Sequence, residues 1–404
     1  MKIIFSVIAM VALSLTAGAQ RTCADKAELD SEPGKYLTSA QYPWPAVRAA
    51  YYSKLNTAAE KATGKQTLEQ IEKLEQKTRS NFTLTGGSLE NTFSSEGYQF
   101  IGDSRLADYR LQQGFFEWIC VNKKMQRNGE YSTVLRIYVN SLPINNLTYT
   151  NSLRIAFSDV FENALSLKDP KKYKPGTASP LIPFLTYFST KAPGFAEAVN
   201  SNGKMYYQDV PEEKIRQGSR DLITRYWVIG QQDTPVLVEV SRKEYLESLL
   251  EYFEREKQYF PAKLAAAKKE GNSEYERKLK QYANWESIIE NKKALVAKVL
   301  RENTTEWLSQ QAVVNPDQDS YLNQKESLPV ETSRHTFRNF YDSDTKAVKL
   351  YKYNPAYFTA TVPNAATPKL VTIAYRYIPQ PSSLRLINNF TTHFDKTGWQ
   401  SLVK

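Results

Sequence analysis

Histidine and cysteine are scarce in this chain of 404 residues, and each occurs only twice. The two histidines, His335 and His393, are far apart in the sequence, so they do not form the closely spaced pair typical of zinc sites. Two cysteines cannot supply a zinc quartet. Phosphate-binding glycine loops, the GxSxG turn and EF-hand spacing are also missing. We therefore expect no metal and no cofactor, and nucleotide-dependent chemistry is disfavoured.

Long apolar runs are missing after residue 19. Before it, Lys2 precedes an apolar run over residues 3–15, and Ala17-Gly18-Ala19 follows it as a small-x-small cleavage pattern. The run is shorter than the roughly 20 residues that span a bilayer. Residues 1–19 are therefore predicted to be a signal peptide. The mature chain should be soluble, without a transmembrane segment, and exported to the periplasm, the cell surface or the extracellular medium.

Export gives the two cysteines a possible role, because oxidising compartments permit disulfides. A bond between Cys23 and Cys120 would tie the N-terminal tail to a strand. The alternative is a buried thiol at Cys120 and a loose tail at Cys23. The sequence leaves both open.

The charge balance is basic, with a formal net charge of +10. Residues 320–404 carry eleven Lys and Arg against five Asp and Glu, a surplus of six. In an envelope protein this composition suggests an acidic envelope polysaccharide, anionic lipid headgroups or another, acidic envelope protein as the partner. The alternative is a solvated surface with a modest imbalance of charge. Nucleic acid is not expected, because no concentrated stripe of Lys and Arg is present.

Hydrophobic periodicity predicts an α+β fold: N-terminal helices on an antiparallel sheet, a second strand-rich segment, a long antiparallel helical hairpin and a β-rich C-terminal tail. Helices are expected over 45–62 and 67–77, interrupted at Gly64. Asn128-Gly129 predicts the turn of a hairpin that returns over 133–139. The predicted segments are 20–170 for the first helices and sheet, 171–241 for the strand-rich segment, 242–313 for the helical hairpin and 314–404 for the basic tail.

The helical hairpin has the clearest pattern. Apolar residues recur at three- and four-residue spacing over 242–269 and 273–311, joined by Glu270-Gly271-Asn272. Fourteen basic and twelve acidic residues between 242 and 313 nearly cancel, as in a solvated face with many ion pairs. Pro261 should kink or split the first helix. The pair is either an arm that docks a partner or a brace packed on the sheets.

One short string, Phe100-Ile101-Gly102-Asp103-Ser104, resembles the opening block of the GDSL hydrolases. The resemblance implies an esterase in which Ser104 is the nucleophile and a C-terminal histidine, here His393, is its base. That family pairs the histidine with an aspartate three residues earlier, whereas this chain has Phe390. The alternative interpretation is an ordinary turn at Gly102-Asp103-Ser104.

Tyrosine is abundant, with 26 residues. Tyr207 lies on a strand predicted over 204–209, and Arg225, Tyr226 and Trp227 lie on the next, predicted over 223–229, so they form a candidate binding patch for sugars or a partner. The alternative is that Tyr207 and Trp227 belong to the core.

These observations predict that the chain is an exported envelope protein that binds a polysaccharide or a protein partner without catalysis. One alternative is a secreted hydrolase, either an esterase or a glycosidase that uses an unassigned pair of carboxylates. The other is a structural component of an envelope assembly.

Overall fold

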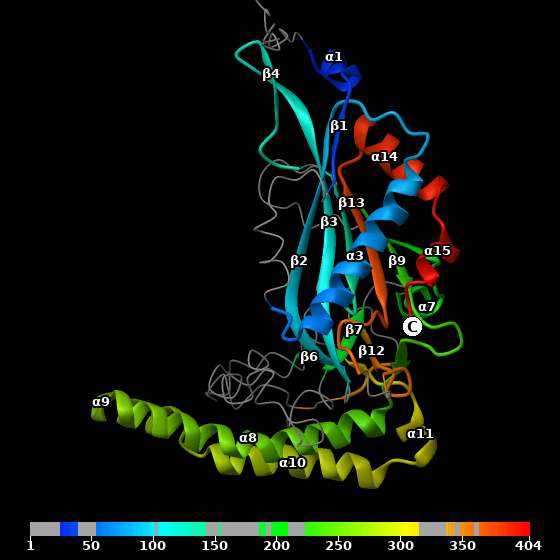
Figure 1. Ribbon diagram of the computed structural model, residues 1–404. Coiled ribbons are helices and arrows are strands. Elements are labelled where there is room, and N and C mark those ends of the chain that lie inside the picture. Colours follow the sequence, from blue (N-terminus) through cyan, green and yellow to red (C-terminus); the bar gives the residue numbers. More distant parts are fainter. Residues whose placement is uncertain are drawn as a thin grey trace, which may run out of the picture.

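A computed structural model describes residues 25–38, 54–101, 104–131, 133–142, 153–154, 186–190, 195–208, 223–314, 337, 339–342, 348–358 and 363–404. Figure 1 shows a tall twisted sheet, helices along one of its faces, and long helices that cross its lower end. The chain has both helices and sheets, and most strand pairs are antiparallel, so the predicted α+β class is confirmed.

The larger sheet has the strand order β1-β2-β3-β5-β13-β9-β8, and β4 pairs with the far end of β3. Every pair is antiparallel except β1 with β2. Strand β13, from near the C-terminus, lies between β5 and β9, so distant parts of the chain complete one sheet. The strands are Lys35–Leu37 (β1), Gly87–Ile101 (β2), Ser104–Val121 (β3), Lys124–Arg127 (β4), Thr133–Val139 (β5), Met205–Gln208 (β8), Ile223–Ile229 (β9) and Val371–Tyr377 (β13).

Three helices cover one face of this sheet: α3 (Ala58–Thr78), α14 (Pro381–Thr392) and α15 (Lys396–Gln400). Helix α3 begins with a capping box, in which Thr57 and Glu60 each accept a hydrogen bond from the other's backbone N–H. Its apolar stripe, with Leu68 and Ile71, is buried against the sheet in the main hydrophobic core. Trp399 of α15 is completely buried in the same core.

The opposite face of the sheet packs on a second, smaller sheet and its connecting segments. Alternate residues of the central strands, such as Tyr138 and Tyr226, form a separate core with Leu237, Tyr357 and Phe358. The smaller sheet has the strand order β10-β12-β7-β6, with β11 paired to β12, and these pairs are antiparallel. The strands are Leu153–Arg154 (β6), Thr186–Thr190 (β7), Leu237–Glu239 (β10), Val313–Val314 (β11) and Val348–Tyr353 (β12).

The long helices at the lower end are α8 (Arg242–Glu270), α9 (Asn272–Gln281) and α10 (Trp285–Glu302), followed by the short α11 (Thr305–Ser309). Apolar side chains from α8 and α10 share a core with β11, β12 and residues 337 and 340. Two further helices lie among the described residues, α1 (Lys26–Ser31) and α7 (Phe195–Asn200), and Gly271 separates α8 from α9. No helix among the described residues is long and apolar enough to cross a membrane.

Several local predictions were wrong. Gly64 does not interrupt α3, since it is a buried position within that helix. The tight hairpin turn is at Asn122-Lys123, whose φ angles of 52° and 62° suit a type I′ turn, and not at Asn128-Gly129. Pro261 does not split the first helix, because α8 continues through it, and the kink that was the other expectation stays a prediction. The single helix predicted over 273–311 is divided, because Asn284 has a left-handed conformation and the chain is extended at Asn303.

Candidate functional site

The predicted aromatic patch does not lie on one surface. Tyr226 and Trp227 are each only 3% exposed, and they belong to cores on opposite faces of the sheet because neighbouring residues of a strand alternate. The Trp227 ring stacks on Phe394, with 5.3 Å between ring centroids. Arg225 lies with its guanidinium carbon 5.7 Å from the centroid of the Tyr377 ring. Tyr207 is paired in register with Arg225, on the adjacent strand β8.

The two residues of the predicted esterase lie on separate elements. Ser104 begins β3, which is antiparallel to β2 and β5, and its buried hydroxyl donates to the carbonyl of Phe358. His393 caps the C-terminus of α14, where its Nδ1 lies 3.0 Å from the carbonyl oxygen of Asn389. The family that this string resembles needs its serine at the end of a parallel strand. This part of the sheet does not meet that requirement.

Cys120, near the end of β3, is disulfide-bonded. The other cysteine of the chain, Cys23, lies outside the described residues, as does the predicted signal peptide. The pairing with Cys23 therefore stays a prediction.

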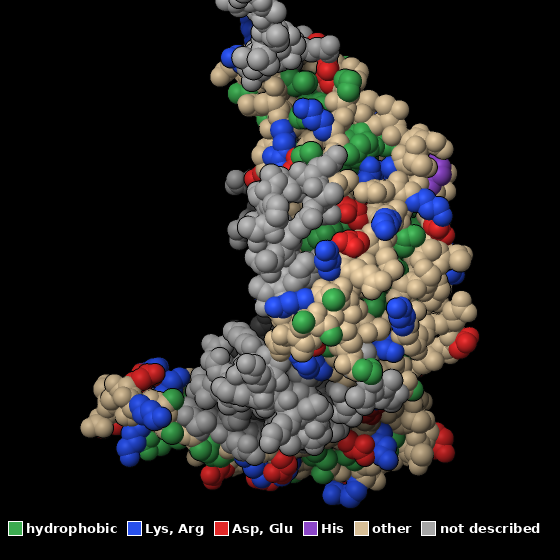
Figure 2. Space-filling view, in the orientation of Figure 1, with side chains coloured by type: hydrophobic (Ala, Val, Ile, Leu, Met, Phe, Trp, Pro, Cys, Tyr) green, Lys and Arg blue, Asp and Glu red, His purple; other side chains and the backbone are tan. Residues whose placement is uncertain are grey.

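A more promising surface is formed by α8, α9 and α10, here called the arm (residues 242–302), whose far end extends beyond the sheets. Figure 1 shows α9 at the end of the arm that is farthest from the sheets. No residue of α9 is buried. Leu279 on α9 is 50% exposed and Leu295 on α10 is 40% exposed. Figure 2 shows acidic and basic side chains intermixed along these helices, with apolar side chains between them.

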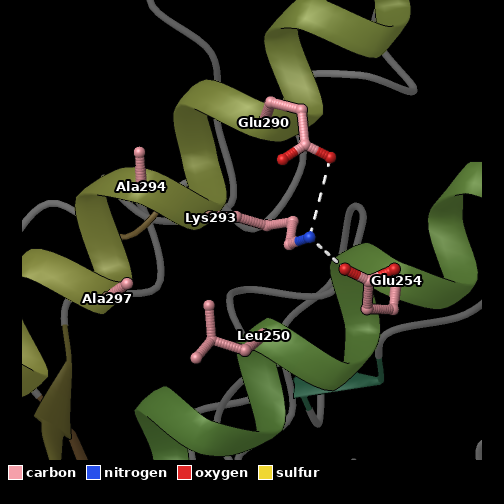
Figure 3. A pocket seen from close by; sticks show the side chains of 6 residues that line it. All are labelled: Leu250, Glu254, Glu290, Lys293, Ala294 and Ala297. Carbon is pink, nitrogen blue, oxygen red and sulfur yellow. Dashed lines mark hydrogen bonds and ion pairs between the residues drawn. The ribbon is translucent and has the colours of Figure 1, made fainter.

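An open groove lies between α8 and α10, with a volume of about 470 Å³. Its apolar part is formed by Leu250, Ala294 and Ala297, and its charged part by Glu254, Glu290 and Lys293. Figure 3 shows the Lys293 ammonium between the two carboxylates, with the apolar side chains to one side. The groove thus offers a small apolar strip beside a row of charges.

The charges of the groove are paired across the two helices. Lys293 contacts Glu254 and lies 3.6 Å from Glu290. Lys257, from α8, lies 2.6 Å from Glu290 and 3.3 Å from Glu254. Hydrogen bonds from Lys293 lower the pKa of Glu254, and hydrogen bonds from Lys257 lower the pKa of Glu290. Both carboxylates are therefore held in their ionised form, and each lies between the same two lysines.

A second cluster surrounds Asp108, at an irregular point in the ladder between β2 and β3. The register shifts between Ser95 and Gly97, so Glu96 is an extra residue opposite Asp108. Glu96 forms ion pairs with Arg110 at 3.1 Å and with Lys54 at 3.5 Å. Such bulges are common beside functional sites because they change the direction of a side chain.

The two acids of this cluster have different environments. Burial raises the pKa of Asp108 to about 6, and the nearby Glu96 carboxylate adds to the rise, whereas a hydrogen bond from Ser141 opposes it. One carboxyl oxygen of Asp108, Oδ1, is buried and has no hydrogen-bond partner. Glu96 is more exposed and has two cationic partners. A buried acid with a raised pKa beside an exposed, ion-paired acid is an arrangement that acid–base sites use.

Sequence reasoning missed the Asp108 cluster and found the arm only in part. The near-cancellation of charge over 242–313 did indicate paired charges on the helices. Nothing local distinguishes Asp108 from other acids, because its environment depends on the bulge in β2 and on Ser141. Among the described residues, no group of three or more His, Cys, Asp or Glu side chains could hold a metal ion.

Comparison of the chain with protein-family models, with curated proteins and with solved structures finds no match.

Proposed function

We propose that the protein is an exported envelope protein that binds another protein, without catalysis, through the arm. The observation that carries this proposal is the end of the arm, where α9 has no buried residue and Leu279 is half exposed. A long helical pair whose distal helix is not needed for a core is well suited to contact a partner. The mixed charge along the arm supports specific recognition more than simple attraction to an anionic surface.

A protein is favoured over a polysaccharide as the partner. Sugars are usually bound by exposed aromatic rings, but Tyr226 and Trp227, two of the predicted binding residues, are buried. The groove instead combines Leu250, Ala294 and Ala297 with two carboxylates that are paired with lysines. This combination suits the apolar face of an amphipathic helix flanked by residues of both signs.

Site-specific photocrosslinking tests the proposal in the cells that produce the protein. Benzoylphenylalanine would replace Leu279 or Leu295 on the arm and, as a matched control, the exposed Thr397 on α15. We expect the same protein adduct from both arm positions and no such adduct from position 397. Adducts of equal yield at all three positions, or none at the arm, would contradict the proposal. Retention of the purified mature chain on envelope polysaccharide, without arm adducts, would favour the polysaccharide.

A hydrolase is the second candidate, and the Asp108 cluster is the observation that favours it. Asp108, whose pKa is raised to about 6, would donate the proton, and Glu96, which pairs with Arg110 and Lys54, would serve as the base or nucleophile. Incubation with envelope polysaccharide should then release new reducing ends, and Asp108→Asn and Glu96→Gln should each abolish the release. The control Asp395→Asn, at the partly exposed start of α15, should keep it. No release by the unsubstituted chain would exclude this candidate for the polymers tested.

A further inference from the structure

The chain contains two Asn-Gly pairs, Asn128-Gly129 and Asn202-Gly203. Asparagine is one of the chemically labile residues of proteins, because the backbone nitrogen of the next residue can attack its side-chain carbonyl. Glycine at that next position hinders the attack least, since it has no side chain. Both pairs therefore have the sequence that favours deamidation, but the structure gives them different surroundings.

Asn128-Gly129 lies between β4 and β5, in an open stretch of the chain. Gly129 is exposed, and a Cβ atom added to it would meet nothing within 4 Å. Its backbone N–H has no hydrogen-bond partner among the described residues, and neither has the side-chain nitrogen of Asn128. The nitrogen that would attack and the nitrogen that would leave are thus both unengaged.

The side-chain carbonyl of Asn128 is polarised for this attack. Its Oδ1 atom accepts a hydrogen bond from the backbone N–H of Glu130 at 3.2 Å. A donor in this position stabilises the negative charge that develops on the oxygen when a nucleophile adds to the carbon. The main chain of Asn128 is held at the same time, because its N–H donates to the carbonyl of Glu117 at 2.8 Å. The polarised amide therefore belongs to the residue directly before the unengaged nitrogen of Gly129.

Asn202-Gly203 has the same sequence, but its reacting groups are engaged. The Oδ1 atom of Asn202 accepts from the backbone N–H of Gly230 at 3.0 Å, which holds the side chain against the end of β9. The N–H of Gly203 donates to the carbonyl of Val228 at 2.7 Å. Both residues have left-handed φ angles, 50° and 88°, as in a type I′ turn. Reaction here would break both hydrogen bonds and the turn.

We propose that Asn128 is a site of spontaneous deamidation in the folded protein, and that Asn202 is protected. Hydroxide from the solvent removes the proton of the Gly129 N–H, and the electron pair of this nitrogen forms a bond to Cγ of Asn128. The bond from Cγ to Nδ2 then breaks, and the leaving nitrogen takes a proton from water and departs as ammonia. Water opens the resulting cyclic succinimide at either carbonyl, which gives aspartate or isoaspartate.

The modification would replace a neutral amide by a carboxylate close to Arg127, whose Nη1 donates to the backbone carbonyl of Asn128 at 3.3 Å. The isoaspartate product would also lengthen the main chain between β4 and β5. Figure 1 shows β4 at the end of the larger sheet that is farthest from the arm. The proposal therefore goes beyond the proposed function and does not depend on it.

Peptide mapping of the purified mature chain tests the proposal after incubation at mildly alkaline pH. Trypsin releases peptides 128–136 and 192–204, each of which contains one Asn-Gly pair. Mass spectrometry detects the replacement of the amide by a carboxyl group and locates it by fragmentation, and chromatography separates aspartate from isoaspartate. We expect Asn128 to convert severalfold faster than Asn202 in the folded chain. Its rate should rise with pH, because the first step removes a proton.

The same incubation in guanidinium chloride is the first control. Without the fold, the two asparagines should convert at nearly equal rates, because both then have glycine beside them and no fixed hydrogen bonds. If Asn128 stays intact in the folded chain, or if Asn202 converts as fast as Asn128 there, the proposal is wrong. An unchanged ratio of the two rates in the denatured chain would also refute it, because the fold would then play no part.

Gly129→Ala is the second control. The added methyl group has open space around it, so the variant should fold as the unsubstituted chain does. The methyl group hinders the approach of the nitrogen to the side chain, and conversion of Asn128 should become severalfold slower while that of Asn202 stays the same. Equal conversion of Asn128 in this variant would contradict attack by the residue 129 nitrogen. The native and denatured rates of the unsubstituted chain remain decisive even if the variant fails to fold.

Discussion

The sheet under α3 and the arm both contain many charged residues, but they place them differently. Under α3, polar groups are buried in specific pairs: Glu75 with Arg79, and Glu72 with Asn91, whose amide oxygen accepts from Gln113. In the arm, Glu254, Glu290, Lys257 and Lys293 form their pairs at the surface. The same pairing chemistry therefore serves two purposes. In the body it makes burial of charge possible, and on the arm it leaves a neutral, hydrated surface available to a partner.

The largest effect should come from the buried pair. Arg79→Met leaves the carboxylate of Glu75, which is 1% exposed, without its bidentate partner. We expect a loss of about 3–5 kcal/mol in the free energy of unfolding, because a buried charge loses its compensation. Urea denaturation measures it. The control is Arg277→Met, which breaks the equally bidentate but exposed pair with Glu274 on the arm, and it should leave the denaturation midpoint unchanged. Equal losses in both variants would remove the distinction between body and arm.

Asp108 should give an intermediate effect, of the opposite sign. Its pKa is raised from the ordinary 3.8 to about 6, so between these values the folded chain binds a proton that the unfolded chain has released. The stability that protonated Asp108 contributes is therefore complete below its ordinary pKa of 3.8. It is lost as the pH rises through about 6, and it stays lost above that pH. Asp108→Asn should remove this loss and stabilise the protein at pH 7.5 by about 1–3 kcal/mol.

Denaturation at several pH values checks the Asp108 prediction. The difference between Asp108→Asn and the unsubstituted chain should shrink as the pH falls from 7 to 4. A difference that is constant over this range would show that Asp108 does not titrate with a raised pKa.

The smallest effect should come from the groove on the arm. Glu290→Gln removes the ion pairs of Glu290 with Lys257 and Lys293. We expect no measurable change in the thermal unfolding midpoint, because these groups are solvated and exposed ion pairs contribute little. The same variant should reduce the photocrosslinking yield at Leu295 if the groove contacts a partner. A large drop in the unfolding midpoint would instead show that these charges stabilise the arm itself.

The predicted elements that agree best with the structure are those with a strong local pattern. Residues 133–139 and 223–229 were predicted as strands, and they form β5 and β9 with those limits. The errors involve signals that other residues can override. Asn128-Gly129 is a good turn sequence, but Asn122-Lys123 also tolerates positive φ and forms the turn between β3 and β4. Gly64 weakens a helix locally, yet it is part of the buried face of α3.

The candidate sites were less predictable than the strands. Trp227 and Arg225 could be assigned to a strand, but their surroundings come from Phe390, Phe394 and Tyr377, more than 140 positions later. No pattern within β9 contains that information. The arm was easier to find because its periodicity and balanced charge are local properties of residues 242–302.

The sequence by itself determined the α+β class, the long charged helices and several strands, because periodicity and charge act between residues that are close in the chain. Only the tertiary structure decided which polar groups have partners. Asp108 owes its raised pKa to burial, and the nearby Glu96 carboxylate adds to the rise, whereas Glu60 accepts hydrogen bonds from Tyr98 and from the backbone of Asn56 and Thr57 through a single oxygen, Oε2. Burial and hydrogen-bond competition depend on contacts between distant segments, and a sequence pattern does not record those contacts.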